Sequence, residues 1–323
     1  MPPESPALFD IVTAPEDAAL VLVPVPFDAT ASYERGTHKG PRAIREASVQ
    51  IDLCDPHFES FIHRGVAMLP IPEDILARNA RLSLLCDQLR ERPDPAILEE
   101  VNQGGEALNQ WVTQAVTHWR GEGKLVGVVG GDHSTPFGAI AAHAEACPEL
   151  GVLHIDANHD LRDAYEGFHW SHASIMHNVL ERTSVTALVQ VGIRDYCEEE
   201  RARASEDPRI FPFYDQALAD ARFCGATFES QCDEILAPLP EDVYVSLDID
   251  GLSPDLCPNT GTPVPGGLSF TQLGFLLHRL VRSGRRVHGF DLSEVAPGED
   301  TEWDANVGMR VLYKLCGAAL TSR

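Results

Sequence analysis

The chain has 323 residues, of which 44% are hydrophobic, and its formal net charge at pH 7 is −24. This hydrophobic content is typical of a globular protein with a substantial core and excludes a disordered chain. The excess of 49 Asp and Glu over 25 Lys and Arg excludes a general nucleic-acid-binding protein, which needs a basic face. Two interpretations of the charge stay open: a solvated, self-repelling surface suited to high salt, or attraction of a cationic substrate.

The N-terminal segment and the cysteines predict a cytoplasmic protein. Residues 1–17 contain neither the basic nor the apolar part of a secretory signal. No apolar run approaches the roughly 18 residues that a membrane helix needs, so we expect no membrane association. The eight cysteines are scattered and form no CxxC pair, which favours reduced thiols over a disulfide framework.

Short apolar runs alternate along the chain with longer amphipathic stretches. Continuous apolar strands separated by helices predict an α/β protein with a parallel sheet covered on both faces. The Pro-containing stretch 92–96 joins two helices and is too short to divide domains, so we expect a single domain over residues 1–323. The predicted strands are 19–25, 124–130, 151–155, 187–193, 242–249 and 285–292, and the predicted helices lie near 40–50, 98–120, 134–146, 171–182, 226–236, 270–283 and 304–317.

Acidic residues and one histidine gather where four of the predicted strands end. In an open parallel sheet, ligands bind beyond the carboxyl ends of the strands. We therefore expect these side chains to meet at one edge of the sheet. They are Asp132 and His133, Asp156 and Asp160, Asp248 and Asp250, and Glu294.

Carboxylates brought this close repel one another unless a cation compensates. Two divalent ions bridged by shared aspartates would do so, and one imidazole with several oxygen ligands suits Mn²⁺ better than Zn²⁺. Each motif alone has an ordinary explanation. Ser134 in GGDHS could cap a helix, and a lone DxD is most often a solvated strand end. Only their occurrence together at four strand ends predicts a metal site.

The sequence resembles the ureohydrolase family, which includes arginase and agmatinase, over nearly its whole length. The resemblance implies a three-layer α/β/α fold with a central, mainly parallel sheet, and a homo-oligomer, either a trimer or a hexamer. The matching segments follow the family's order: VPVPFDATASYERGTHKGPRAIREAS (23–48), GGDHS (130–134), DANHDLRDAYEGFHWSHAS (156–174), SLDIDGLSPDLCPNTGTPVPGGLS (246–269) and DLSEVAPGED (291–300).

The resemblance also implies a chemistry, which is hydrolysis of a guanidino group at a site with two Mn²⁺ ions, releasing urea and an amine. By motif position, His133, Asp156, Asp160 and Asp248 would surround one ion. The other ion would be held by Asp156, Asp248 and Asp250, with Asp156 and Asp248 bridging the pair.

Two further residues take catalytic roles from the resemblance, and Asp160 is counted with them. Glu294 would bind the planar guanidinium through paired, charge-assisted hydrogen bonds. His172 would assist departure of the amine by proton transfer. The alternative for His172 is a histidine at a helix start without a catalytic role.

One position departs from the family pattern. The third residue of the family's DAxxD motif is a histidine that binds the second ion, whereas this chain has Asn158 there and His159 next to it. Strand alternation predicts that Asn158 faces the ions and His159 the opposite side. Because an amide oxygen is a weaker donor than imidazole to such a metal, we expect a weakened second site with Asn158 as a ligand, unless the backbone brings His159 in.

The substrate is implied only in outline. YEGxxxSH and TGTPVPGGLS are similar to agmatinase-like members, and the Asn- and Ser-containing loop by which arginases recognise an amino acid is replaced. Agmatine or a similar small cationic compound is therefore expected, while guanidinobutyrate, guanidinopropionate and formiminoglutamate stay open. Because of Asn158, a weakly active or inactive partner or binding subunit is the second hypothesis, which the metal content of the purified protein would test.

Overall fold

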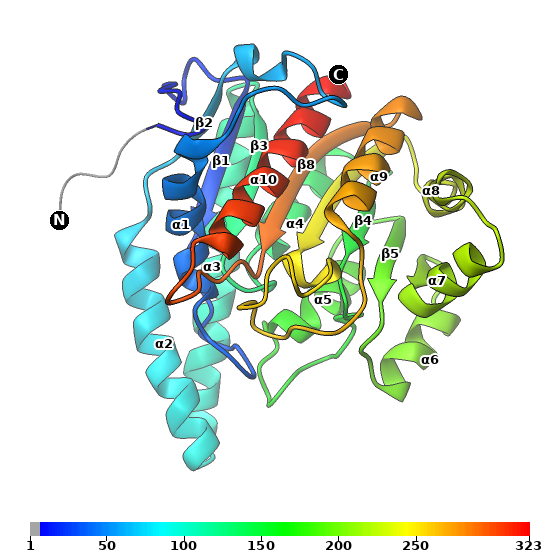
Figure 1. The fold of residues 1–323 in the computed structure, drawn as a ribbon. Helices are drawn as coiled ribbons and strands as arrows, with labels where there is room; N and C mark the ends of the chain where they lie inside the picture. The colour runs from blue at the N-terminus through cyan, green and yellow to red at the C-terminus, as the bar shows by residue number, and fades with distance from the viewer. Residues whose placement is uncertain (1–6) are drawn as a thin grey trace.

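The computed structural model describes residues 7–323. Its centre is an eight-stranded sheet in the order β2-β1-β3-β8-β7-β4-β5-β6, and every neighbouring pair is parallel (Figure 1). The predicted parallel sheet is confirmed. The strands are β1 (Leu20–Val25), β2 (Val66–Met68), β3 (Leu125–Gly130), β4 (Gly151–Ile155), β5 (Ala187–Ile193), β6 (Ile210–Tyr214), β7 (Asp242–Asp248) and β8 (Arg286–Ser293).

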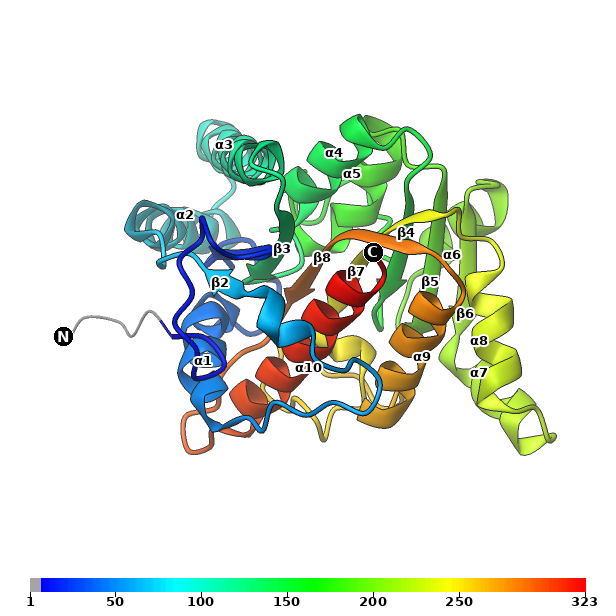
Figure 2. The same ribbon diagram turned by 90° about the horizontal axis from the view of Figure 1, so that it is seen from above.

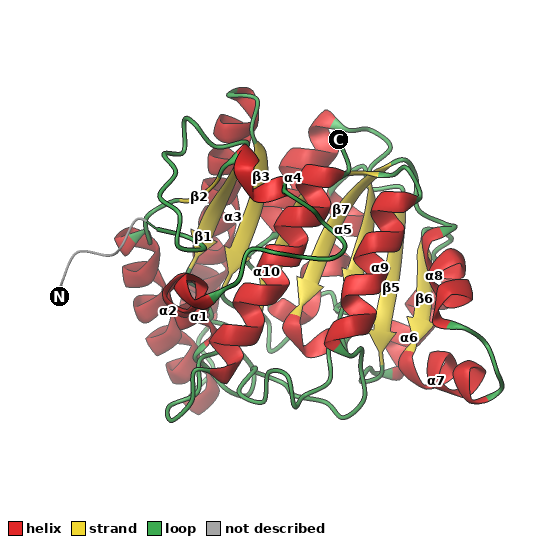
Figure 3. Cartoon of the chain, turned by 45° about the horizontal axis from the view of Figure 1, so that its top comes forward, coloured by secondary structure: helices red, strands yellow, loops and turns green. Residues whose placement is uncertain are grey.

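Helices cover both faces of this sheet, as Figures 2 and 3 show. In the part of the chain that the structure describes, none of them is both long and apolar enough to cross a membrane. The α-helices are α1 (Gly40–Ala47), α2 (Glu73–Glu91), α3 (Pro95–Gly121), α4 (Phe137–Ala146), α5 (Ile175–Arg182), α6 (Glu198–Glu206), α7 (Asp215–Phe223), α8 (Phe228–Leu236), α9 (Phe270–Arg282) and α10 (Trp303–Thr321).

The alternation of side chains along each strand divides the core into two layers. On β3, Leu125 and Val129 join the apolar cluster that contains α9 and α10. Val126 and Val128 join the opposite cluster, which contains α3, α4 and α5. Apolar side chains on both strand faces are what a sheet between two helical layers requires, so the predicted three-layer α/β/α architecture is confirmed.

The ranges predicted from the sequence omitted three helices and two strands, each for a physical reason. Strand β2 has three residues, and β6 is an edge strand whose proline interrupts the apolar pattern. Helix α6 buries only Glu200 and Ala204. Helices α2 and α7 bury few side chains. The stretch 92–96 joins α2 to α3.

Ser134 does not cap the following helix. Helix α4 begins at Phe137, with Pro136 at its N-cap and no side-chain cap. The Ser134 hydroxyl instead donates to Asp132, 2.5 Å away. Ser134 therefore binds the aspartate of its own GGDHS turn and takes no part in the helix. His133, between the two, lies at the carboxyl edge of the sheet.

The strand order brings the four acidic strand ends together. Strands β3, β8, β7 and β4 are consecutive neighbours in the middle of the sheet, and parallel strands place all their carboxyl ends at one edge. Strands β3 and β4 follow each other along the chain, but β8 and β7, which come later in the sequence, lie between them in the sheet. Ligands bind at such a change in strand order in open α/β sheets, so the fold itself places a site there.

Gly131 is required by this packing. A Cβ at Gly131 would lie 1.9 Å from the carbonyl oxygen of Phe27, whereas a Cβ at Gly121, the last residue of α3, would meet nothing within 4 Å. We expect Gly131→Ala to lower the free energy of unfolding by about 2 kcal/mol or more, because backbone must move. The matched variant Gly121→Ala should leave it unchanged or raise it slightly. Urea unfolding measures both, and equal stabilities would contradict this packing.

Candidate metal centre and active site

Side chains at the carboxyl ends of β4 and β7 converge on the imidazole of His133, which follows β3. His133 Nδ1 lies 2.9 Å from an oxygen of Asp156, 3.3 Å from one of Asp160 and 3.4 Å from one of Asp248. A second group, with oxygens within 4.8 Å of one another, consists of Asp156, Asp248 and Asp250. The structure thus brings together the acids proposed from the sequence, and Asp156 belongs to both groups.

Backbone amides orient these carboxylates. The amide of Asn158 donates to Asp156 Oδ1 at 2.6 Å, and that of Asp250 donates to Asp248 Oδ1 at 2.8 Å. The amide of Ala157 donates to Asp250 Oδ1 at 3.0 Å. In each case the amide binds one carboxylate oxygen. For Asp156 and Asp248 the other oxygen faces the cluster, 2.9 and 3.4 Å from His133 Nδ1.

The electrostatics of the cluster favour bound cations. Burial and the charge of neighbouring acids raise the pKa of Asp250 to about 7 and the pKa values of Asp160 and Asp248 well above normal. Burial alone would lower the pKa of His133, but hydrogen bonds to Asp156 and Asp160 outweigh it and raise that pKa well above its usual value. Without a metal, protons must supply the missing positive charge. Several buried carboxylates with one imidazole therefore fit oxygen-preferring divalent ions.

His154, on β4, is a member of the cluster that the sequence reasoning missed. One of its ring nitrogens lies within 4.8 Å of a nitrogen of His133 and of carboxylate oxygens of Asp156 and Asp160. The amide of Gln190 donates to His154 Nδ1 at 2.9 Å, so the proton is on Nε2, which donates to Asp156 at 2.8 Å. His154 thus orients a shared carboxylate. Its position two residues before Asp156, on the same strand face, was the signal that could have revealed it.

His154 is part of a fully buried polar row that crosses the sheet below the cluster. The row runs through Gln190 on β5, His154 on β4, Ser246 on β7 and Asp291 on β8, each paired in register with the next. Ser246 Oγ lies 2.9 Å from Nε2 of His133. The nitrogen that faces the carboxylates is therefore Nδ1, and the row fixes the ring from behind, as partners of metal-binding histidines do.

Asn158 and His159 point to different surroundings. Asn158 lines the cavity beside the cluster, and its side-chain nitrogen donates to the carbonyl of Asp195 at 2.8 Å. His159 is buried, and its Nδ1 donates to the Gln190 side chain at 2.7 Å. Asn158 thus lies at the cavity and His159 is held by Gln190 in the interior, and the role of Asn158 as a metal ligand stays a prediction.

Two acids of the site hold left-handed backbone conformations. The φ angle is 55° at Asp160 and 65° at Glu294, which costs of order 1–3 kcal/mol for a residue other than glycine. Hydrogen bonds compensate locally. The Asp160 carbonyl accepts from the amides of Met176 and His177 at 3.1 and 3.0 Å, and the Glu294 amide donates to Gly131 at 2.7 Å. Such strain is typical of functional sites.

Glu294 closes a small cavity next to the cluster. One oxygen accepts from the amide of His133 at 2.9 Å. A Cβ at Gly261 would lie 3.2 Å from the other oxygen, so the glycine keeps access to that oxygen open. Burial, followed by the charge of Asp132, raises the pKa of Glu294 well above its usual value. A bound cationic group would favour its ionised form.

His172 lines both this small cavity and a larger one. It opens a short 3₁₀ turn, and its Nε2 is 3.2 Å from the hydroxyl of Ser32. Burial and repulsion from His133 lower the pKa of His172 to about 4. The imidazole is therefore neutral near pH 7 and can exchange a proton with a group in either cavity.

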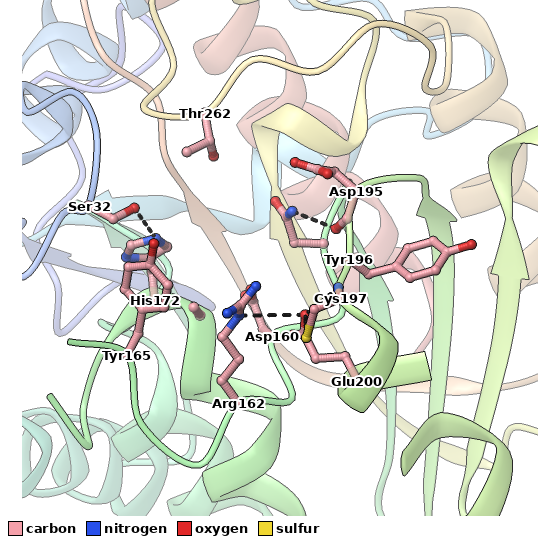
Figure 4. Close-up of a pocket in the computed structure, with 12 residues that line it drawn as sticks. Ser32, Asp160, Arg162, Tyr165, His172, Asp195, Tyr196, Cys197, Glu200 and Thr262 are labelled. Atoms are coloured by element: carbon pink, nitrogen blue, oxygen red, sulfur yellow. Dashed lines mark hydrogen bonds and ion pairs between the residues drawn. The ribbon is translucent and has the colours of Figure 1, made fainter. Parts of the chain in front are cut away.

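The larger cavity, of about 270 Å³, extends from the cluster to polar residues of the loop after β5. In Figure 4, Ser32, His172 and Tyr165 form one side and Asp195 and Tyr196 the other. The lining consists of Ser32, Asn158, Asp160, Arg162, Tyr165, His172, Ala173, Asp195, Tyr196, Cys197, Glu200 and Thr262.

A buried carboxylate–imidazole cluster at the carboxyl edge of the sheet marks this chain as an α/β/α protein with a candidate metal centre. A sequence model of the Arginase family matches residues 18–317. The chain belongs to that family. The N(1)-aminopropylagmatine ureohydrolase of Thermus thermophilus is 32% identical over 286 residues, 87% of this chain and 84% of that protein. The agmatinase of Bacillus subtilis is 30% identical over 315 residues, 93% and 91% of the two chains.

Solved structures share the fold. The agmatine ureohydrolase of Thermoplasma volcanium superposes with a TM-score of 0.75 at 23% identity, covering 98% of this chain and 95% of that one. The proclavaminate amidino hydrolase of Streptomyces clavuligerus gives a TM-score of 0.74 at 22% identity, covering 99% and 98%. At these identities the likeness establishes the architecture alone.

The raised pKa values predict how the metal-free protein responds to pH. A carboxyl such as Asp250, with a pKa of about 7, binds its proton more tightly than in the unfolded chain, where the pKa is about 3.9. The contribution of this carboxyl to the free energy of unfolding therefore falls as the pH rises from about 4 to 7. The raised pKa of His133 acts in the same direction, since its contribution is lost as pH rises through the folded-state pKa.

Chelator-treated protein should accordingly melt at a lower temperature at about pH 7.5 than at about pH 5.5. Excess divalent cation should raise the melting temperature more at the higher pH, because it replaces the lost protons. Calorimetry with and without the ion measures both effects. A metal-free protein that is more stable at the higher pH would show that the cluster does not dominate the titration.

Proposed function

We propose that the protein hydrolyses the guanidino group of agmatine or a similar compound to urea and an amine. The observation that carries this proposal is the position of Glu294. Its second oxygen faces a cavity next to the acidic cluster, with His172 on the same cavity wall. A planar cation between a carboxylate and the cluster can be held through paired, charge-assisted hydrogen bonds. The similarity to agmatinases and aminopropylagmatine ureohydrolases supports the same reaction.

The cluster would hold two Mn²⁺ ions. His133 through Nδ1, Asp160 and the shared Asp156 and Asp248 would bind one, and Asp250 with the shared acids the other. When bound, such a pair supplies a nucleophilic water near neutral pH and positive charge beside the reacting carbon. One imidazole among oxygen donors supports Mn²⁺ over softer ions.

The remaining roles fall to protein groups. Glu294 would orient the guanidinium. Burial raises the pKa of its carboxyl, and the positive charge of a bound guanidinium would favour the ionised carboxylate that binds it. Asp160, next to His133, belongs to both the metal site and the catalytic group. His172, neutral near pH 7, would accept the proton that the attacking water releases and pass it to the departing amine. The Ser32 hydroxyl fixes the direction of its Nε2.

The second hypothesis, a weakly active or inactive partner or binding subunit, rests on Asn158. Against it, Glu294 and His172 both line the cavity beside the cluster, and a scaffold would need neither. Two ions bound per chain would favour the enzyme, and none would favour the scaffold.

The free thiols of all eight cysteines support our placement of the protein in the cytoplasm, and we propose a homo-oligomer, trimer or hexamer, from the family resemblance alone.

With Mn²⁺ supplied, agmatine or an analogue without an α-amino acid head should release urea faster than arginine. The physical reason is that the loop 161–173 places Arg162 and Tyr165, rather than a set of short polar side chains, beside the cavity. Urea release with each compound at equal concentration measures this preference. Faster hydrolysis of arginine than of every decarboxylated or shortened analogue would overturn the substrate assignment while leaving the reaction type intact.

Asn158→His should tighten the second metal site, because a neutral imidazole is a better donor to Mn²⁺ than an amide oxygen. A ligand defect of this kind costs roughly tenfold or more in affinity, since losses behind the ligands already cost about 10–100-fold. Titration of metal-free protein with Mn²⁺ measures the change. His159→Ala is the matched control and should bind the same number of ions as the unaltered chain. Loss of an ion in this control would identify His159 as the ligand.

A further inference from the structure

The substrate's tail has a defined path if the guanidinium binds at Glu294. The small cavity that contains Glu294 and the larger cavity share three wall residues, Ser32, His172 and Thr262. The two cavities therefore adjoin, and the larger one is the space open to a chain attached to a guanidinium at Glu294. The end of the tail then meets the loop after β5, on the far side of the cavity in Figure 4. This inference rests on the proposed function.

Three charged side chains lie at that far end, and two of them, Glu200 and Arg162, form an ion pair. Glu200 is buried, and its oxygens accept from the amides of Leu161 and Cys197, both at 3.1 Å. Arg162 Nε lies 3.6 Å from Glu200, and its guanidinium sits over the ring of Tyr165, 5.1 Å from the ring centre. Because the two opposite charges face each other, this pair offers little net charge to a ligand.

Asp195 is different, because its carboxylate is free. Among residues 7–323 no group donates a hydrogen bond to it and no cation pairs with it, and the residue is exposed on the cavity wall. Its backbone, in contrast, is fixed. The Asp195 amide donates to the Ala157 carbonyl at 3.0 Å, and its carbonyl accepts from Asn158 at 2.8 Å. A firmly held position with an unused negative charge is well suited to a cationic group.

We propose that Asp195 is the specificity-determining residue that binds the ammonium at the far end of the substrate. The substrate class is then an alkylguanidine with an amino group on its tail. A tail ending in a carboxylate would face Asp195 and be repelled. The aromatic rings of Tyr165 and Tyr196, which line the same cavity, offer apolar surface to the methylene groups between the two charges.

The test compares three compounds that share the guanidinium and differ at the tail: agmatine, n-butylguanidine and 4-guanidinobutyrate. The unaltered protein with bound metal should prefer agmatine. Asp195→Asn should raise KM for agmatine roughly tenfold or more, the value of a charge-assisted hydrogen bond, with little change in kcat. KM for butylguanidine should not change, and the preference against guanidinobutyrate should weaken.

Glu198→Gln is the matched control. It removes the same charge from an exposed residue at the start of α6 that does not line the cavity, and it should leave all three KM values unchanged. An equal loss for agmatine and butylguanidine in Asp195→Asn, no loss at all, or a loss of the same size in the control would overturn the role of Asp195. If the unaltered protein prefers guanidinobutyrate, the end of the tail is bound by Arg162 and not by Asp195. No urea from any compound would contradict the proposed function itself.

Discussion

The repulsion among buried carboxylates around His133 is the constraint on which the rest of the site depends. Asp156, Asp160 and Asp248 each place an oxygen within 3.4 Å of one imidazole nitrogen. Burying charges without compensation costs several kcal/mol per ion, so the arrangement needs either protons or cations. Raised carboxyl pKa values and the proposed binding of divalent ions both follow from the same geometry. The acids are held in this arrangement because four neighbouring parallel strands all end at this edge.

The sheet also supports the cluster from within. In an α/β/α core, a polar side chain inside a strand must find a hydrogen-bond partner. Gln190, His154, Ser246 and Asp291 meet this need because the strand register places them side by side. Ser246 of this row contacts His133, and His154 donates to Asp156. The strands thus fix the positions of both groups, as binding of a cation would need.

Local patterns in the sequence predicted much of this structure. The apolar runs located the central strands, and the acids after them, such as Asp156 and Asp248, were recognised because each follows a strand directly. The order of the strands was beyond such reasoning, since it depends on contacts between distant segments. His154 was missed because it lies inside an apolar run. Asp195 was missed because an exposed acid in a loop has no distinguishing pattern until the fold places it on a cavity wall.

The replacement of a family histidine by Asn158 links the two halves of the site. An amide side chain carries a donor and an acceptor on one planar group. Its nitrogen is used by the carbonyl of Asp195, so the oxygen on the other branch is the atom left for the cluster. Asn158 and Asp195 also pair as an isolated parallel bridge. The residue proposed as a ligand of the second ion is thus also the one that contacts the backbone of the proposed tail-binding acid. A neutral imidazole at position 158 also carries one donor and one acceptor in one plane, but on ring atoms with a different spacing. A gain in metal binding there would therefore come with a changed contact to the Asp195 carbonyl.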